Sequence, residues 1–563
     1  MKKLIVLSLL QVVMKSAVRT LIVSLIVILT AGCGGKALNK ALSGDTVKGV
    51  KAKVLAAGSP IHGANGLYFG PDGNLYIGSV FGREIIKMNP NTGKILDRIG
   101  PERGVESPDD LTFGKDGSLY WTAIATGEVG KIGPDGKKST VANLGKGVNP
   151  ITIKHDDGRM FVGQAFFADS LFEVYEDGRQ PRLILEKTNS INAFDFGPDG
   201  YLYAPSPMRG LVVRINVENG QTITIASGLT IPSYAVKFSP SGQLFALEQP
   251  TGKVLKINIQ TGQKEVYAVL ERGLDNLAFN SEGRLFVSNA EEGTVVEVFP
   301  NGTHKVVSPG GMIAPAGVAV LSDDKGDERV YVADTWMFRE YDGRTGRQES
   351  YVHYAIPKLF PPHAVSADGR NLLVVSRIFG GVVQVWDPEK RETVATHRGF
   401  SYPSTAVRFQ GDLVVADVGK VIRDTSGKRV TLAELAVPGG LATQGDNLWA
   451  ADRAKGTVLQ LISGGTTLTP PRVVAMDLAS PEGLAVGRDG NLLVVEAGTG
   501  SLRHIDLANG AVTTVASGLK LGVGAEAPTP PPGVFSGVAV GPSGAIYVTG
   551  NKANVLYKIG YSR

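Results

Sequence analysis

Short apolar segments separated by glycine-rich turns make up most of the chain after about residue 46. Residues 65–69 and 74–78 each read as a short strand with alternating apolar side chains, and Pro71-Asp72-Gly73 lies between them. Asp-Gly between two such runs is typical of a tight turn joining antiparallel strands, because glycine accepts the positive φ that the turn needs. The pattern therefore predicts a hairpin at residues 65–78.

The same hairpin pattern returns along the chain. No sustained helical periodicity accompanies it after residue 46, so the sequence predicts an all-β protein. Counting looser copies, the pattern occurs about twelve times at a period of roughly 42 residues, the length of a four-stranded propeller blade. After the first copy, the clear ones begin at Asp110, Ala193, Ala235, Asn276, Gly440, Gly483 and Gly537, and the looser ones at Pro150, Gly317, Ala364 and Ala406.

Twelve blades in one ring would leave a very wide hole, so we expect two six-bladed β-propellers in tandem, over residues 51–302 and 303–563. Residues 53–57 read as a fourth strand with no blade before it, and the last copy stops after its third strand at residues 555–559. In one ring, residues 53–57 would complete blade twelve. In two rings they would complete blade six, while residues 304–308 would cross over to complete blade twelve. Both arrangements remove an open edge strand, and we expect the second, with its exchange of strands.

The N-terminus has the features of an export signal. Residues 1–33 hold two apolar runs, and a start at Met14 rather than Met1 gives the more ordinary basic and apolar order. The segment ending at Cys33 resembles the lipobox of bacterial lipoproteins, with Thr30 where leucine is more usual. Cys33 is the only cysteine, and we expect it to be lipidated and residues 34–50 to form a flexible tether. The predicted partner is a lipid bilayer of the bacterial cell envelope, at the outer membrane or cell surface. The alternative is an uncleaved transmembrane anchor.

Charge and histidine spacing disfavour two classes of function. The formal net charge of +5 is small for 563 residues and is spread without basic clusters, so binding of nucleic acid has no support. The seven histidines form no His-x-His or His-Glu-x-x-His pair, which disfavours a zinc protease.

Chemistry in a propeller usually lies at the mouth of the central channel, which the residue before the innermost strand of each blade faces. In the first ring five of these six residues are Asn or Asp, and side-chain oxygens converging on one axis suit a hard divalent cation such as Ca²⁺. The second ring builds the same loops without them, so backbone hydrogen bonding by Asn and Asp is a poor explanation. A metal site and a water-filled polar funnel remain as alternatives. The first-ring residues are Asn65, Asp109, Asn149, Asn192, Tyr234 and Asp275; the second-ring residues are Ala316, His363, Thr405, Gly439, Glu482 and Ser536.

The repeat resembles the NHL-repeat and regucalcin-like gluconolactonase group of six-bladed propellers. The resemblance lies in Asn65-Gly66-Leu67 followed by Pro71-Asp72-Gly73, and it covers most of the chain after residue 46. In that family an Asn, an Asp and an early Glu-Gly hold a divalent metal that helps to open sugar lactones. By resemblance the Asn ligands are Asn65, Asn149 or Asn192, and the Asp is Asp275 or Asp109. The only Glu-Gly at this position is Glu482-Gly483, in the second ring.

Three functions follow as hypotheses. The first is a metal-dependent hydrolase of lactones or related esters, with Asp109 or Asp275 as the base and Tyr234 next to the substrate. The second is a cell-surface binding scaffold without catalysis, whose small-molecule or protein partner the sequence does not name. The third is a lyase resembling the virginiamycin-type propellers, which share the Gly-Pro-Asp-Gly-x-Leu phrase but whose paired histidines have no match here.

Overall fold

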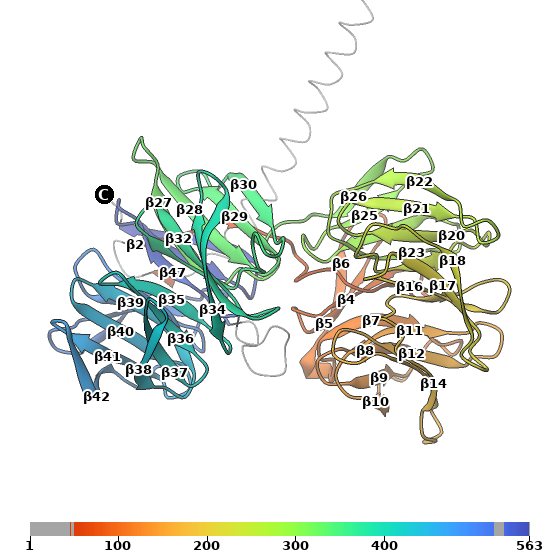
Figure 1. Ribbon diagram of the computed structural model, residues 1–563, viewed down its shortest axis with the longest axis horizontal. Helices are drawn as coiled ribbons and strands as arrows, with labels where there is room; N and C mark the ends of the chain where they lie inside the picture. Colours follow the sequence, from red (N-terminus) through yellow and green to blue (C-terminus); the bar gives the residue numbers. More distant parts are fainter. Residues whose placement is uncertain (1–44, 47–49, 523–533, 562–563) are drawn as a thin grey trace, which may run out of the picture.

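Twelve antiparallel sheets make up the computed structural model, which describes residues 45–46, 50–522 and 534–561 (Figure 1). Each sheet has the four strands of one propeller blade, and one sheet carries a fifth, β1 (Asp45–Thr46). The all-β prediction and the predicted number of blades are confirmed. Within the described residues no helix has the length and apolar composition that a bilayer crossing requires.

The first ring contains blades one to six. They span residues 67–99 (β3–β6), 108–143 (β7–β10), 148–186 (β11–β14), 195–226 (β15–β18), 236–269 (β19–β22) and 274–308 (β23–β26). The innermost strand of each blade comes first in the sequence. These inner strands are β3 (Leu67–Phe69), β7 (Pro108–Phe113), β11 (Val148–Ile153), β15 (Asp195–Phe196), β19 (Val236–Phe238) and β23 (Leu274–Phe279).

The second ring contains blades seven to twelve. They span residues 318–353 (β27–β30), 364–400 (β31–β34), 405–434 (β35–β38), 438–475 (β39–β42), 481–517 (β43–β46) and 538–561 (β47–β49). The inner strands are β27 (Val318–Ser322), β31 (Ala364–Asp368), β35 (Thr405–Phe409), β39 (Pro438–Gln444), β43 (Pro481–Val486) and β47 (Val538–Val540).

Hydrogen bonds between the first and last blades close each ring. Ser288 Oγ of blade six donates to the Asn65 carbonyl of blade one at 2.7 Å. In the second ring the Gly537 N–H of blade twelve donates to the Ala316 carbonyl of blade seven at 3.0 Å. Buried side chains fill the space between blades, as where Leu67 and Ile77 pack against Phe286. The structure is therefore two separate six-bladed propellers.

The predicted exchange of strands between the rings is wrong. β2 (Val50–Ala57) pairs antiparallel with β49 (Val555–Tyr561) and completes blade twelve. β26 (His304–Ser308) stays in its own blade, paired with β25 (Val295–Val298). The physical reason is chain connectivity: a short turn joins β25 to β26, so this pairing costs little loop-closure entropy. Within the described residues only blade twelve lacks a local fourth strand, and β2 supplies it. Residues 50–57 thus belong to the second ring, and residues 304–308 to the first.

The predicted N-terminal segments lie almost entirely outside the described residues. This holds for the signal at residues 1–33, for Cys33 and for most of the tether at residues 34–50. At the end of the predicted tether, Asp45–Thr46 instead pairs as β1 with β46 (Val512–Ser517) of blade eleven. The described part of this segment is therefore attached to the second ring.

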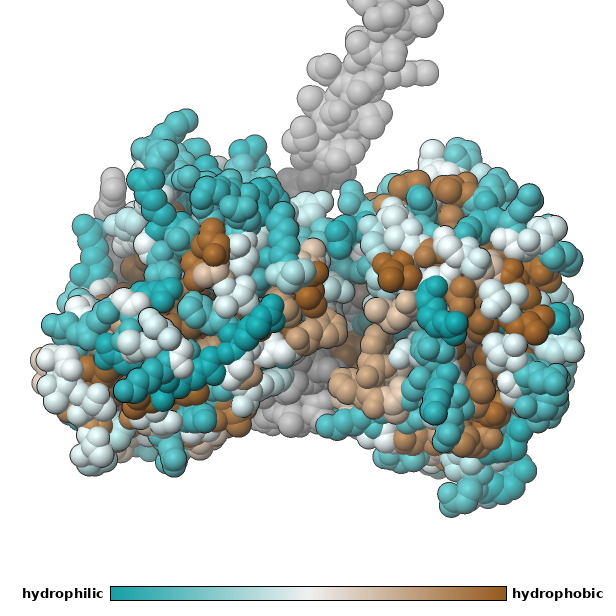
Figure 2. Space-filling view, viewed as in Figure 1, coloured by the Kyte–Doolittle hydropathy of each residue, from teal (hydrophilic) through white to brown (hydrophobic). Residues whose placement is uncertain are grey.

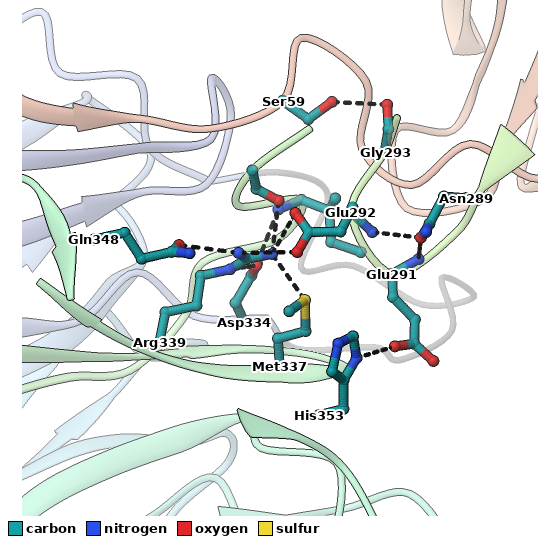
Figure 3. Close-up of polar contacts among 12 residues, drawn as sticks. Ser59, Asn289, Glu291, Glu292, Gly293, Asp334, Met337, Arg339, Gln348 and His353 are labelled. Atoms are coloured by element: carbon teal, nitrogen blue, oxygen red, sulfur yellow. Dashed lines mark hydrogen bonds and ion pairs between the residues drawn. The ribbon is translucent and has the colours of Figure 1, made fainter. Parts of the chain in front are cut away.

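The two rings form separate lobes that meet over a limited area (Figures 1 and 2). Phe81 of the first ring lies 6.1 Å from Trp336 of the second, measured between ring centroids. A second contact between the rings involves Arg339 of β29 (Met337–Asp342), which binds Asp334 of its own blade, the Gly311 carbonyl of the linker and Glu292 of the first ring (Figure 3). His353 hydrogen-bonds to Glu291 beside this cluster. Tyr234, at the mouth where the first ring's inner strands begin, lies near Tyr354 of the second ring.

Candidate functional site

Two aspartates face each other at the mouth of the first ring. Asp109 and Asp275 belong to blades two and six, which flank blade one. Burial raises the pKa of Asp109 well above its usual value, and the neighbouring Asp275 carboxylate raises it further. Burial, with Asp110 nearby, raises the pKa of Asp275 to about 7. In the described part of the chain no hydrogen-bond donor reaches either carboxylate. Nothing there offsets the repulsion between the two negative charges.

A second pair of polar residues, Asp110 and Asn276, lies one residue further along β7 and β23. The sequence interpretation missed this pair. Asn276 Nδ2 donates to Asp110 Oδ1 at 3.2 Å, and the Ile151 N–H donates to Asp110 Oδ2 at 3.1 Å. Asp110 is fully buried, and these bonds connect blades two, three and six. The signal was present in the doublets Asp109-Asp110 and Asp275-Asn276, of which only the first members were interpreted.

A buried lysine lies deeper in the channel. Lys237 of β19 donates from Nζ to the Phe194 carbonyl at 3.3 Å. Burial raises the pKa values of Asp195 and Asp110, and the Lys237 charge opposes both shifts. Lys237 and Asp195 each lie three residues after a mouth residue, so the alternation of an inner strand could have revealed them. The positive charge of Lys237 therefore offsets the negative charges of Asp195 and Asp110, deeper in the channel. It does not offset those of Asp109 and Asp275.

Below these residues the channel widens into a funnel on the opposite face of the first ring. The funnel has a volume of about 1210 Å³, and Lys237, Asp195, His155, Phe196 and Phe238 are among the residues that line it. The channel therefore carries polar groups along its whole length, from the aspartate pair at one mouth to the funnel at the other.

The remaining predicted mouth residues differ in their hydrogen bonds and packing. Asn192 Oδ1 accepts the N–H of the next residue, Ala193, at 2.7 Å, and Asn65 Oδ1 accepts the Val80 N–H at 3.4 Å. Asn149 is buried at 3% exposure, and its carbonyl accepts a hydrogen bond from Thr122. Tyr234 packs against Phe166, and burial together with nearby Tyr354 and Asp275 raises its pKa.

The residues at this mouth fit a divalent cation in part. Among the described residues no three His, Cys, Asp or Glu side chains form a group that could hold a metal ion. Asp109, which is buried, and Asp275, which is half-buried, nonetheless provide two uncompensated carboxylates, the ligand type that Ca²⁺ prefers. A cation here would be held by these two carboxylates, with amide oxygens and water completing its coordination.

The second ring has a different mouth. Ser404, rather than the predicted Thr405, is the equivalent residue of the ninth blade, because its N–H donates to the Ala416 carbonyl as that of Asn65 does to Gly78. Glu482 is fully buried, but Arg453 Nε lies 3.2 Å from its Oε1 and the Ser536 N–H 2.7 Å from its Oε2. Among the described residues of this mouth there is therefore no uncompensated acidic pair.

No protein-family model and no curated protein sequence matches the chain. Among solved structures, it is similar to the extracellular domain of the putative one-component system BT4673 from B. thetaiotaomicron, at 11% identity and a TM-score of 0.32 over 92% of this chain and 82% of that one. It is also similar to a gluconolactonase from Xanthomonas campestris, at 15% identity and a TM-score of 0.36 over 44% of this chain and 88% of that one. It is also similar to virginiamycin B lyase from Staphylococcus aureus, at 12% identity and a TM-score of 0.24 over 58% of this chain and 94% of that one.

Likenesses this distant concern the fold alone and carry no argument about activity. The assignment of the chain as a double β-propeller rests on its own twelve sheets and on the closure of each ring.

Proposed function

We propose that the protein is an exported, lipid-anchored double propeller whose first ring binds a divalent cation, with Ca²⁺ as the first candidate, at Asp109 and Asp275. The observation that supports this most is the aspartate pair: a buried carboxylate and a half-buried one face each other, and neither accepts a hydrogen bond within the described residues. Such a pair requires a cation or a shared proton between its members. Lys237 is engaged deeper in the channel and does not supply that charge.

The reaction proposed for this site is hydrolysis of a lactone or related ester. A bound divalent cation supplies a Lewis acid that polarises a carbonyl group. One aspartate of the pair would act as the general base and accept a proton from water. The water oxygen adds to the carbonyl carbon, the ring C–O bond breaks, and the departing oxygen takes the proton back from the aspartate. Tyr234 at the rim would orient the substrate.

A second candidate function is binding without catalysis. One observation favours it: Tyr234 lies near Tyr354 of the second ring and near Glu291, so part of the first mouth is covered by the contact between the rings. A covered mouth restricts the approach of a substrate. In this case the cation would stabilise the fold and the lobes would present surfaces to a partner at the cell envelope.

Melting temperatures with and without divalent cations test the cation site. A ligand that binds only the native state at a hundredfold excess over its Kd stabilises it by about 2.7 kcal/mol, which for a ring of this size is a rise of about 5–10 °C. We expect CaCl₂ to raise the melting temperature of the wild type, and the variant with both Asp109→Asn and Asp275→Asn to lose this rise. The control variant, with Asp156→Asn and Asp177→Asn, removes two exposed carboxylates of the same ring and should keep it.

Assays of lactone hydrolysis on the same three proteins separate the two candidate functions. Loss of hydrolysis together with the calcium effect supports the hydrolase, and a calcium effect without hydrolysis supports the binding protein. No shift of the wild type with calcium, magnesium, manganese or zinc would refute the cation site.

A further inference from the structure

Polar side chains from three blades converge on one cavity at the mouth of the second ring. His363 of blade eight, Glu482 of blade eleven and Ser536 of blade twelve line a channel of about 340 Å³, together with Arg377 and Phe535. His363, Glu482 and Ser536 occupy the positions that Asn65, Asp109 and their equivalents hold in the first ring. The arrangement of charge is different, since here the acidic residue has a cationic partner.

Two buried polar atoms at this mouth have no hydrogen-bond partner in the described part of the chain: His363 Nε2 and Ser536 Oγ. The other imidazole nitrogen, His363 Nδ1, lies 3.0 Å from the Pro361 carbonyl oxygen. Because a carbonyl oxygen only accepts, Nδ1 carries the proton and Nε2 presents a lone pair. Burial and nearby Arg377 lower the pKa of His363 to about 3, so the ring stays neutral at physiological pH. A ligand at this mouth therefore meets an acceptor that needs a donor.

Two guanidinium groups lie beside this acceptor. Arg377 is buried, its Nε donates to the Pro403 carbonyl at 2.8 Å, and its guanidinium lies 5.0 Å from the Tyr402 ring and 5.3 Å from the Phe535 ring. Arg453 lies 5.8 Å from the same Phe535 ring and pairs with Glu482. Planar guanidinium groups held against aromatic rings are suited to recognising a carboxylate.

The size of the channel restricts the ligand. Beyond the mouth the inner strands present small side chains to it, among them Ala319, Ser366, Ala442, Ala485 and Ala539. In the first ring the corresponding positions carry Tyr68, Thr112, Asp195 and Lys237. The second channel is mostly apolar below a polar mouth, and its cavity of about 340 Å³ admits a small molecule and not a polymer.

We propose that the mouth of the second ring binds a small hydroxylated carboxylate, of the size of a sugar acid. A hydroxyl of the ligand donates to His363 Nε2, Ser536 Oγ bonds to a neighbouring oxygen, and the ligand carboxylate lies beside Arg377 with Arg453 behind it. This site is separate from the aspartate pair of the first ring and does not depend on the function proposed there.

Isothermal titration calorimetry of the purified protein with D-gluconate tests the proposal. We expect gluconate to bind, and glucose and acetate to bind at least tenfold more weakly, because each lacks one of the two recognised groups. His363→Leu removes the acceptor and should weaken gluconate binding at least tenfold while leaving acetate unchanged. Arg377→Gln should abolish gluconate binding. If Arg377→Gln does not fold, because the residue is buried, the result for His363→Leu alone tests the proposal. Arg370→Gln removes an exposed arginine of the same ring and should bind gluconate as the wild type does.

Several outcomes would overturn the proposal. They are the absence of a gluconate signal from the wild type, equal binding of gluconate to the wild type and His363→Leu, equal binding of glucose and gluconate, and a preference for inorganic phosphate over gluconate. The last result would assign the mouth to an inorganic anion.

Discussion

The same position in the two rings shows how one residue's surroundings decide its chemistry. Asp109 in the first ring and Glu482 in the second are both buried carboxyl groups at the start of an inner strand. Glu482 has Arg453 and a backbone N–H as partners, whereas Asp109 faces another carboxylate. The sequence predicted the positions of both residues, because the repeat aligns them. It also placed Asp109 and Asp275 in one site, because both hold the repeated mouth position of the first ring. It did not predict the pairing of Glu482 with Arg453, because Arg453 comes from another blade and only the closed ring brings it near.

Stability should depend on pH through the aspartate pair. The folded-state pKa of Asp275 is about 7, above the unfolded value of 3.8. The folded state therefore binds more protons between these values, and stability from this group falls as pH rises from about 4 to about 7. A change of this size in the pKa corresponds to roughly 4 kcal/mol. In EDTA, Asp275→Asn should melt at a higher temperature than the wild type at pH 8, with the difference disappearing at pH 4.

Differential scanning fluorimetry across this pH range measures the difference. Asp177→Asn, at an exposed aspartate of the same ring, serves as the control and should follow the wild type at every pH. A constant difference between Asp275→Asn and the wild type from pH 4 to pH 8 would contradict the assignment of a raised pKa to Asp275.

At the scale of the strand, the sequence predicted local pairings well and the long-range pairing poorly. Hairpins within each blade follow from apolar alternation and Asp-Gly turns, which are properties of neighbouring residues. The pairing of β2 with β49 joins residues 50–57 to residues 555–561. The alternation of buried and exposed residues in β2 suits the outer edge of any blade. The sequence pattern therefore did not specify which blade β2 completes. The structure assigns it to the one blade without a local fourth strand.

A charge placed in β2 should therefore destabilise the second ring. Val54 is buried at 7% exposure and packs in a cluster with Val548 and Tyr557 of blade twelve. Val54→Asp buries an unpaired carboxylate, which we expect to cost about 3 kcal/mol or more. Limited proteolysis with mass spectrometry should then show cleavage first within residues 318–561. Lys53→Asp, at the exposed neighbouring position, should cleave as the wild type does. Earlier cleavage of residues 67–308 would contradict the role of β2 in closing the second ring.

At the scale of the molecule, the N-terminus connects the proposed membrane anchor to the second ring. β1 and β2 belong to blades eleven and twelve, and the chain between Cys33 and Asp45 spans at most about 40 Å. A lipid on Cys33 would thus hold the second ring next to the bilayer.

Replacing the predicted lipidation site tests the anchor. Cys33→Ser should move the protein from the membrane fraction to the soluble fraction, measured by fractionation and immunoblotting. A Cys33→Ser protein that remains in the membrane fraction would support an uncleaved apolar anchor instead.

The position of one lobe against the other depends on a buried charge cluster. Arg339 and Asp334 are fully buried, with 2.7 Å between Nε and Oδ2, and Glu292 of the first ring lies 3.4 Å from Arg339 (Figure 3). Asp334 also accepts the N–H groups of Ile313 and Ala314 in the linker, at 2.9 and 2.7 Å. Arg339 therefore compensates two carboxylates, one from each ring, while Asp334 fixes the segment between the rings.

Arg339→Met should both destabilise the protein and loosen the two lobes. It leaves the buried Asp334 and the half-buried Glu292 without their cation, and removing one partner of a buried pair costs about 3–5 kcal/mol. We expect a lower melting temperature and, by small-angle X-ray scattering, a larger radius of gyration. Adding Glu292→Gln removes one of the two uncompensated charges and should restore part of both. Arg347→Met, at an arginine of the same blade whose side chain is 76% exposed, should change stability by less than about 0.5 kcal/mol. An unchanged radius of gyration in Arg339→Met would show that the apolar contacts around Phe81 and Trp336 alone hold the rings together.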